Sequence, residues 1–124
     1  MNYEDFKREM DAYHRDVDRE ADSLKDPYVR LDRLRTLYNR FDEHERAMAN
    51  SVLAEWALSD NEMMRFDALV LIDELKLTIA VPALRELSLQ CKASDAPNAS
   101  HYSQWAERII AKLIQNDRAE TQRT

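Results

Sequence analysis

The chain contains no glycine among its 124 residues, although average composition would supply about nine. Glycine is the residue that enters left-handed backbone conformations without steric cost, as tight hairpins and phosphate-binding loops require. Its absence excludes Walker and dinucleotide-binding loops. It also disfavours a sheet of many strands joined by tight turns, so the sequence favours an all-helical fold.

Cysteine and long apolar runs are also scarce. The single cysteine, Cys91, cannot form a disulfide within the chain and indicates a reducing compartment. No run of 18 apolar residues is present, so we expect no membrane-spanning helix. The charged first ten residues lack the apolar core of a signal peptide. These features predict a cytoplasmic protein.

Charge is abundant and unbalanced. Charged residues make up 34% of the chain and the formal net charge is −6. Nucleic acids and anionic membranes require a basic surface, so we expect neither as a partner. The length corresponds to a single domain with one core.

Apolar residues recur at steps of three and four along the whole chain, which is the pattern of amphipathic helices. The sequence predicts about six helices, over residues 2–24, 28–41, 42–57, 60–76, 80–92 and 99–115. Residues 116–124 carry no apolar face, and we expect them to form a disordered tail.

Several residues predict where helices begin. Asp42 with Glu45, and Ser59 with Glu62, have the spacing of capping boxes. Asp26 precedes Pro27 at the start of the second helix, and Asn2 is a cap for the first. A proline is tolerated in the first turn of a helix, so Pro82 predicts the start of the fifth helix and not a kink.

Two helices have distinctive apolar patterns. The helix over 60–76 is apolar around most of its circumference, which predicts the central position in the domain. The first helix carries one narrow stripe, which either packs along the domain or forms the seam of a dimer. The members of this stripe are Tyr3, Phe6, Met10, Tyr13, Val17, Ala21 and Leu24.

The segment 60–75 reads D-x4-R-x2-A-L-x-L-I-x2-L, and the segment 80–87 reads A-V-P-A-L-x2-L. Together, over residues 60–87, they resemble the HEAT repeat, an antiparallel helix pair that stacks into a solenoid. Asp60, Arg65 and Pro82 occupy positions where that family often has Asp, Arg and Pro. The resemblance implies a domain over 1–115 with capping helices at 1–41 and HEAT-like helices at 42–115. It also implies a scaffold or binding surface.

No set of residues predicts catalysis. His44 and Ser51, with Glu55 on the same stripe, are about 10 Å apart along a helix, which is too far for a nucleophile and its base. Asp11, His14 and Asp18 share a helix face and could form part of a metal site, but we interpret them as ion-pairing on a solvated face. His101 has no identifiable partner in the sequence, and Cys91 is expected to be buried. We therefore predict a protein that is not an enzyme and binds no cofactor or metal.

The charges are segregated along the chain. Residues 1–26 carry nine acids against five bases, residues 27–41 carry four arginines against one aspartate, and residues 42–62 carry six acids against one arginine. The acids of 42–62 either cap helices and contact solvent, or form a patch for a basic partner. The candidate partner-binding residues are Asp42, Glu43, Glu55 and Glu62.

These observations predict a non-enzymatic protein-binding module. A concrete form is a small acidic immunity or inhibitor protein that neutralises a toxin or another basic partner. The alternative is a structural or regulatory subunit that forms a homodimer through the first helix. Neither hypothesis determines whether the protein is a monomer or a homodimer.

Overall fold

The computed structural model describes residues 1–26 and 28–122, with side chains described through Gln115. This part of the chain is all α-helical and contains no strand, which confirms the predicted fold class. The helices are α1 (Tyr3–Leu24), α2 (Tyr28–Arg40), α3 (Glu43–Trp56), α4 (Glu62–Leu75), the short 3-10 helix η1 (Thr78–Ala80), α5 (Val81–Lys92) and α6 (Ala99–Gln122).

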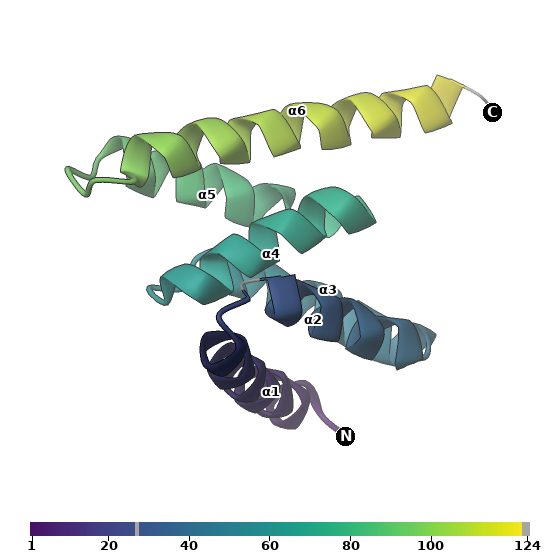
Figure 1. The fold of residues 1–124 in the computed structure, drawn as a ribbon. Helices are drawn as coiled ribbons and strands as arrows, with labels where there is room; N and C mark the ends of the chain where they lie inside the picture. Colours follow the sequence, from purple (N-terminus) through teal and green to yellow (C-terminus); the bar gives the residue numbers. More distant parts are fainter. Residues whose placement is uncertain (27, 123–124) are drawn as a thin grey trace.

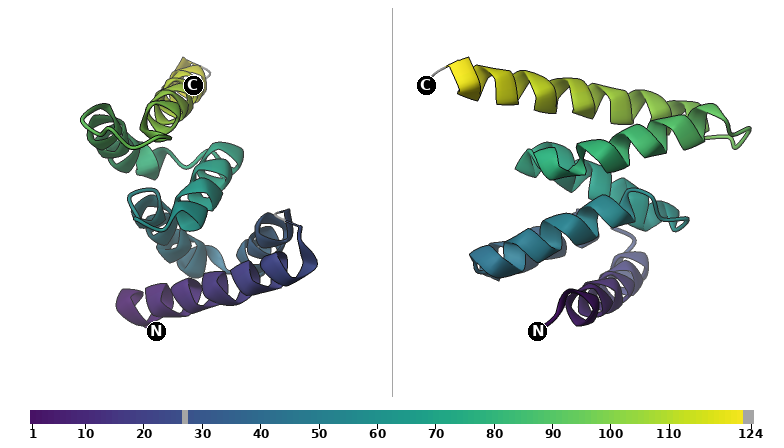
Figure 2. Two further views of the ribbon diagram at one scale, coloured as in Figure 1. Left: turned by 60° about the vertical axis from the view of Figure 1, so that its left-hand side comes forward. Right: turned by 180° about the vertical axis from the view of Figure 1, so that it is seen from behind.

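Consecutive helices pack as three pairs, α1 with α2, α3 with α4, and α5 with α6. The pairs stack from the N-terminal end at the bottom of Figure 1 to α6 at the top. In the left view of Figure 2, α3 and α5 lie on one side of the stack, and α2, α4 and α6 lie on the other. Helix α4 contacts α2, α3 and α6, and α3 contacts α1, α4, η1 and α5, so α3 and α4 together occupy the centre of the molecule.

Helix starts follow the predicted caps with one exception. The side chain of Asn2 accepts a hydrogen bond from Asp5 N, and Asp42 and Glu45 form both bonds of a capping box. The predicted box of Ser59 and Glu62 is wrong, because the N-cap of α4 is Asn61, whose side chain accepts from the amides of the first helical turn. Asparagine is as good an N-cap as serine, so α4 starts two residues later than expected.

Two helices end at a lysine in a position that glycine usually occupies. Lys25 after α1 has φ 55°, and Lys76 after α4 has φ 57°. Both are left-handed C-caps, positions that glycine usually fills. The absence of glycine therefore does not remove this conformation, and each lysine bears a steric cost of about 1–2 kcal/mol.

The remaining boundaries agree with the sequence except at the C-terminus. Pro82 lies in the first turn of α5, as predicted, and Pro27 lies outside the described residues. The backbone of α6 continues as helix to Gln122, past the expected end at Gln115. Residues 123–124 of the expected tail lie outside the described part.

The core is centred on the inner side of α4. Ala68, Leu69 and Ile72 are fully buried there. They belong to one continuous cluster that reaches Leu53 of α3 and Leu84 of α5, and it extends into α6. The prediction that α4 is the central helix is confirmed by this burial.

Several apolar residues on the predicted helix faces are only partly buried or are exposed. Met63 and Phe66 of α4 are 40% and 39% exposed. They lie on a stripe of α4 that faces solvent, on the side of the molecule that α2, α4 and α6 form. Leu24 and Tyr28 are exposed at the turn between α1 and α2. The buried line of α1 runs through His14 instead of Tyr13.

The apolar stripe of α1 packs within the chain. Phe6, Met10, Val17 and Ala21 are each at most 5% exposed. The ring of Phe6 lies 5.2 Å from that of Phe41, which follows α2. These residues are therefore covered by their own domain in this structure.

Replacing Leu69 with alanine is expected to lower the free energy of unfolding by about 2–5 kcal/mol, because the side chain is fully buried and leaves a cavity. The matched control is Leu89→Ala on α5, where leucine is 63% exposed and the expected change is below about 0.5 kcal/mol. Urea unfolding of both variants measures the difference. A Leu69→Ala protein as stable as the wild type would contradict the central position of α4.

Candidate functional site

Three ionisable side chains meet inside the domain. Asp67 of α4 is fully buried, and its Oδ2 lies 2.8 Å from His14 Nε2 of α1 and 2.9 Å from Arg30 Nε of α2. His14 is 1% and Arg30 7% exposed. This cluster of His14, Arg30 and Asp67, which we name the buried triad, joins α1, α2 and α4.

The buried triad has contacts on both sides. Arg30 Nη1 lies 3.6 Å from Asp18, which is partly exposed. The His14 ring meets the Trp56 indole edge-on at a centroid distance of 5.1 Å. Trp56 Nε1 donates to Asp11 at 2.7 Å. The network therefore runs from the surface, through the core, to the surface again.

The prediction that Asp11, His14 and Asp18 form ion pairs on a solvated face is wrong for His14. The three side chains have separate partners, namely Trp56, Asp67 and Arg30. Among the described residues, no three His, Cys, Asp or Glu side chains are placed to hold a metal ion. The three residues of α1 thus contribute to packing and do not converge on a ligand.

The chemistry open to the buried triad is limited by burial. A carboxylate that receives two donors can orient an imidazole, as in a general base, but the ring of His14 is closed to solvent. A substrate has no path to it in this structure. Buried charges are costly unless they are paired, and the two donors on Asp67 meet that requirement. The triad therefore holds the first helix pair against α4.

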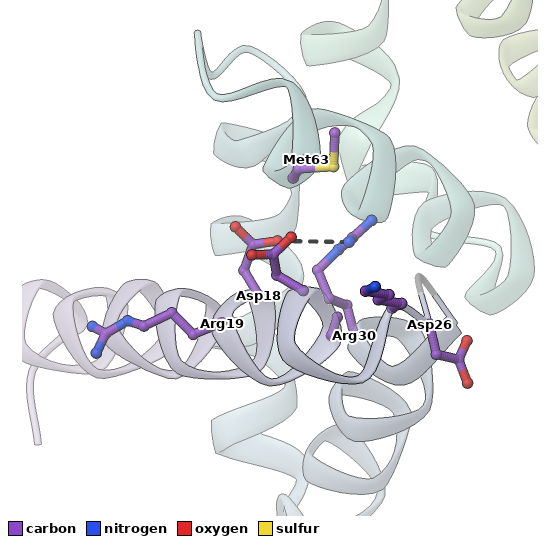
Figure 3. Close-up of a pocket in the computed structure, with 8 residues that line it drawn as sticks. Asp18, Arg19, Asp26, Arg30 and Met63 are labelled. Carbon is purple, nitrogen blue, oxygen red and sulfur yellow. Dashed lines mark ion pairs between the residues drawn. The ribbon is translucent and has the colours of Figure 1, made fainter.

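A groove opens next to the buried triad, with a volume of about 560 Å³. It lies between the second half of α1, the turn to α2 and the start of α4 (Figure 3). Figure 3 shows Met63 of α4 on the opposite side of the groove from Asp18, which is ion-paired with Arg30. The full lining is Asp18, Arg19, Ala21, Asp22, Lys25, Asp26, Arg30 and Met63.

An exposed apolar surface adjoins this groove. Met63 and Phe66 lie on the outer stripe of α4, and the Phe66 ring is 5.4 Å from that of Trp105 on α6. Trp105 in turn lies 5.9 Å from the ring of His101. We name this surface the aromatic strip, and it consists of the exposed Met63, Phe66 and His101 together with Trp105, which is partly buried against the core.

At the other end of the face formed by α2, α4 and α6, ion pairs link the helices. Arg35 of α2 binds Glu74 of α4 through two hydrogen bonds of 2.7 and 2.9 Å. Lys112 of α6 lies 3.4 Å from Asp73 of α4. Charged side chains thus bridge α4 to both neighbours near its C-terminal end, and the aromatic strip occupies the N-terminal end.

A second groove, of about 450 Å³, lies behind the strip between α4 and the turn into α6. Arg65 stacks over the Tyr102 ring at 5.1 Å and donates to Ser59 O at 2.9 Å. Burial, followed by the nearby Glu62 carboxylate, raises the pKa of the Tyr102 phenol. Arg65 therefore connects α4 to the turn before it and to α6, and its described contacts do not include an ion pair with Asp60.

The four candidate partner-binding residues do not gather in one place. Asp42 caps α3, while Glu43 and Glu55 lie at opposite ends of that helix, which is about 18 Å along its axis. Glu55 accepts a hydrogen bond from Tyr3, and burial together with this bond raises the pKa of Tyr3. Glu62, at the start of α4, accepts a hydrogen bond from Asn98. Of the four candidates, it is the one next in sequence to Met63 of the aromatic strip.

The other candidates for chemistry have ordinary surroundings. His44 is exposed, and Ser51 donates to the carbonyl of Ala47 one turn earlier. Cys91 is buried, as expected. These contacts bring no nucleophile together with a base.

Comparison with protein-family models, with curated proteins and with solved structures gives no match. Within the described part of the chain, no helix is long and apolar enough to cross a membrane. A functional argument therefore depends on the surface of the molecule itself.

The buried triad predicts a large effect of a nearly isosteric change. Asp67→Asn removes the charge that pairs with buried Arg30, and we expect the free energy of unfolding to fall by about 3–5 kcal/mol. Asp73→Asn, which affects only the pair with exposed Lys112, should cost less than about 1 kcal/mol. Thermal and denaturant unfolding compare the two. Equal losses would show that Asp67 does not hold the helices together.

Proposed function

We propose that this protein is a non-enzymatic protein-binding module whose partner carries a basic surface. The observation that carries the proposal is the aromatic strip, an exposed apolar surface on a face that is otherwise closed by ion pairs. The face is built by α2, α4 and α6. If the stacked pairs are HEAT-like, as the sequence resemblance implies, this face corresponds to the inner side of such a stack.

Apolar exposure of this kind has a physical cost for an isolated domain. Contiguous apolar patches larger than about a few hundred Å² are uncommon on monomeric proteins and usually mark contact sites. Aromatic and methionine side chains are enriched in interfaces, and tryptophan often dominates binding energy. Phe66 is exposed and packs on Trp105, which is itself partly buried against the core, so a partner could cover Phe66 and the open edge of Trp105 at little conformational cost.

Charge supports a basic partner. The chain has a formal net charge of −6, whereas the groove beside the strip is balanced, with Asp18, Asp22 and Asp26 against Arg19, Lys25 and Arg30. A net acidic charge accelerates association with a basic protein and disfavours acidic ones. Glu43 and Glu55 contribute to this field without forming a patch, because steering depends on the summed charge.

The concrete form that we propose is a small acidic immunity or inhibitor protein that neutralises a toxin or another basic partner. Its small size, its acidic charge and the closed surroundings of His14 and Cys91 are compatible with a role that needs binding alone. The alternative, a subunit that dimerises through α1, has less support because its apolar stripe is covered by the same chain.

The test is quantitative capture from cells that produce the protein. The wild-type chain is compared with Phe66→Ala/Trp105→Ala, which truncates the strip, and with Leu89→Ala, which truncates a leucine on α5 that is more exposed than either. We expect a basic protein to be retained by the wild type and by Leu89→Ala, and to be reduced about tenfold or more with the strip variant.

The inhibitor form is tested with the captured protein. Its expression alone should arrest growth, and co-expression with the wild-type chain should restore it, while the strip variant should not. Capture of only acidic proteins, or equal capture by all three chains, would contradict the proposed function. Growth arrest that the wild-type chain fails to relieve would leave binding intact and remove the inhibitor role.

A further inference from the structure

We infer that a pocket between the first half of α1 and the connection from α2 to α3 binds a trimethylammonium group or a similar alkylated ammonium cation. The pocket has a volume of about 160 Å³. Three aromatic side chains line it, Phe6, Tyr13 and Phe41, together with two carboxylates, Glu9 and Glu45. The pocket shares no residue with the aromatic strip, so this inference goes beyond the proposed function and does not depend on it.

Helical spacing places the α1 side chains of the pocket on one face. Phe6, Glu9 and Tyr13 follow one another at steps of three and four residues, which brings side chains together on one side of a helix. Phe41, in the turn after α2, meets Phe6 at a ring-centroid distance of 5.2 Å and an interplanar angle of 55°. The Tyr13 hydroxyl donates to Arg33 O at 3.3 Å, which ties the third ring to α2.

The side chains that line the pocket give it a negative charge, because no lysine, arginine or histidine is among them. Glu45 belongs to the capping box of α3, and its Oε1 accepts from the backbone amide of Asp42 at 3.0 Å, which fixes the position of the carboxylate. Glu9 is exposed, and among the described residues it has no basic group within ion-pair distance. The two basic side chains next to Glu9 in the sequence pair with aspartates instead.

A neighbouring ring already holds a cation. The guanidinium of Arg46 lies 5.3 Å from the centroid of the Tyr38 ring, and Tyr38 packs edge-on against Phe41 at 6.5 Å. Arg46 also donates to two carbonyl oxygens at the end of α2 and does not line the pocket. Within the described part of the chain, no cationic side chain stacks on the three rings of the pocket itself. Their faces are therefore available to a ligand.

An alkylated ammonium matches both the rings and the carboxylates. The face of an aromatic ring attracts a cation, and a trimethylammonium group has no N–H donor that an aromatic wall would leave unpaired. A primary ammonium is strongly hydrated and would lose hydrogen bonds to water, while the carboxylates would repel an anion. A cavity of about 150 Å³ holds a benzene molecule. The volume of the pocket therefore suffices for one trimethylammonium group, which is of similar size.

The experiment titrates the full chain with choline and with dimethylbutanol, its uncharged isostere, in which a carbon atom replaces the nitrogen. Because the two molecules have the same shape, the difference in their affinities reports on the charge. ¹H–¹⁵N NMR follows the backbone amides, and nuclear Overhauser effects between the methyl protons and the rings of Phe6, Tyr13 and Phe41 locate the ligand. We expect choline to bind at this place, about tenfold or more tightly than the isostere.

Two matched pairs of variants assign the binding to the pocket. Phe41→Leu removes a ring and keeps an apolar side chain, and Phe66→Leu makes the same change on α4, outside the pocket. Glu9→Gln neutralises a lining carboxylate, and Glu86→Gln makes the same charge change on α5. We expect Phe41→Leu to weaken choline binding about tenfold and Glu9→Gln about threefold, with both controls unchanged. The effect of Glu9→Gln should shrink as salt rises.

A further arm of the experiment identifies the source of the cation. A ten-residue peptide with one trimethyl-lysine is compared with the same peptide carrying unmodified lysine, and with choline. The unmodified peptide should bind about tenfold or more weakly than the methylated one. Tighter binding of the methylated peptide than of choline assigns the group to a polypeptide, and the reverse order assigns it to a free small molecule.

Several outcomes would overturn the inference. Equal binding of choline and its isostere would leave an apolar pocket without cation selectivity. Choline binding that ignores both Phe41→Leu and Glu9→Gln would place the cation elsewhere. Glu9 is exposed, so Glu9→Gln tests the site even where Phe41→Leu perturbs the fold. The capture experiment varies the aromatic strip and this one varies the pocket, so failure of either leaves the other result standing.

Discussion

The arrangement of the helices depends on one carboxylate in the core. Asp67 lies in the middle of α4 and receives His14 from α1 and Arg30 from α2. Apolar packing alone is tolerant of helix sliding, but a buried charge is satisfied only where both donors reach it. The triad therefore restricts where the first helix pair can sit against α4. The groove beside Asp18 and Met63 is a consequence of that placement.

Helix α4 has two sides with opposite roles. Its inner side carries Leu69 and Ile72 into the core, and its outer stripe carries Met63 and Phe66 toward solvent. The high apolar content of α4 supplies both its buried inner side and its exposed outer stripe. Its neighbours α2 and α6 are tied to its C-terminal end by Arg35–Glu74 and Lys112–Asp73. The N-terminal end is left with exposed apolar side chains, so the outer side of α4 changes character along its length.

Much of the fold follows from local patterns, since periodicity and caps are properties of neighbouring residues. The six helices, the capping box of Asp42 and Glu45, and the role of Pro82 are predicted correctly for this reason. The buried triad is not, because its members are 16 to 53 residues apart and their pairing needs three dimensions. A signal was present: His14 continues the line of Met10, Val17 and Ala21 at helical spacing. The aromatic strip was missed because a uniformly apolar helix does not reveal which of its sides remains uncovered.

The left-handed lysines at positions 25 and 76 have a consequence for the unfolded chain. Glycine is the most freely rotating residue, so a chain without it has fewer unfolded conformations to lose on folding. The strain at two lysines is confined to the folded state, whereas the smaller conformational freedom applies to every position where another protein would have a glycine. Part of the stability of this domain therefore originates in the entropy of its denatured ensemble and is invisible among its native contacts.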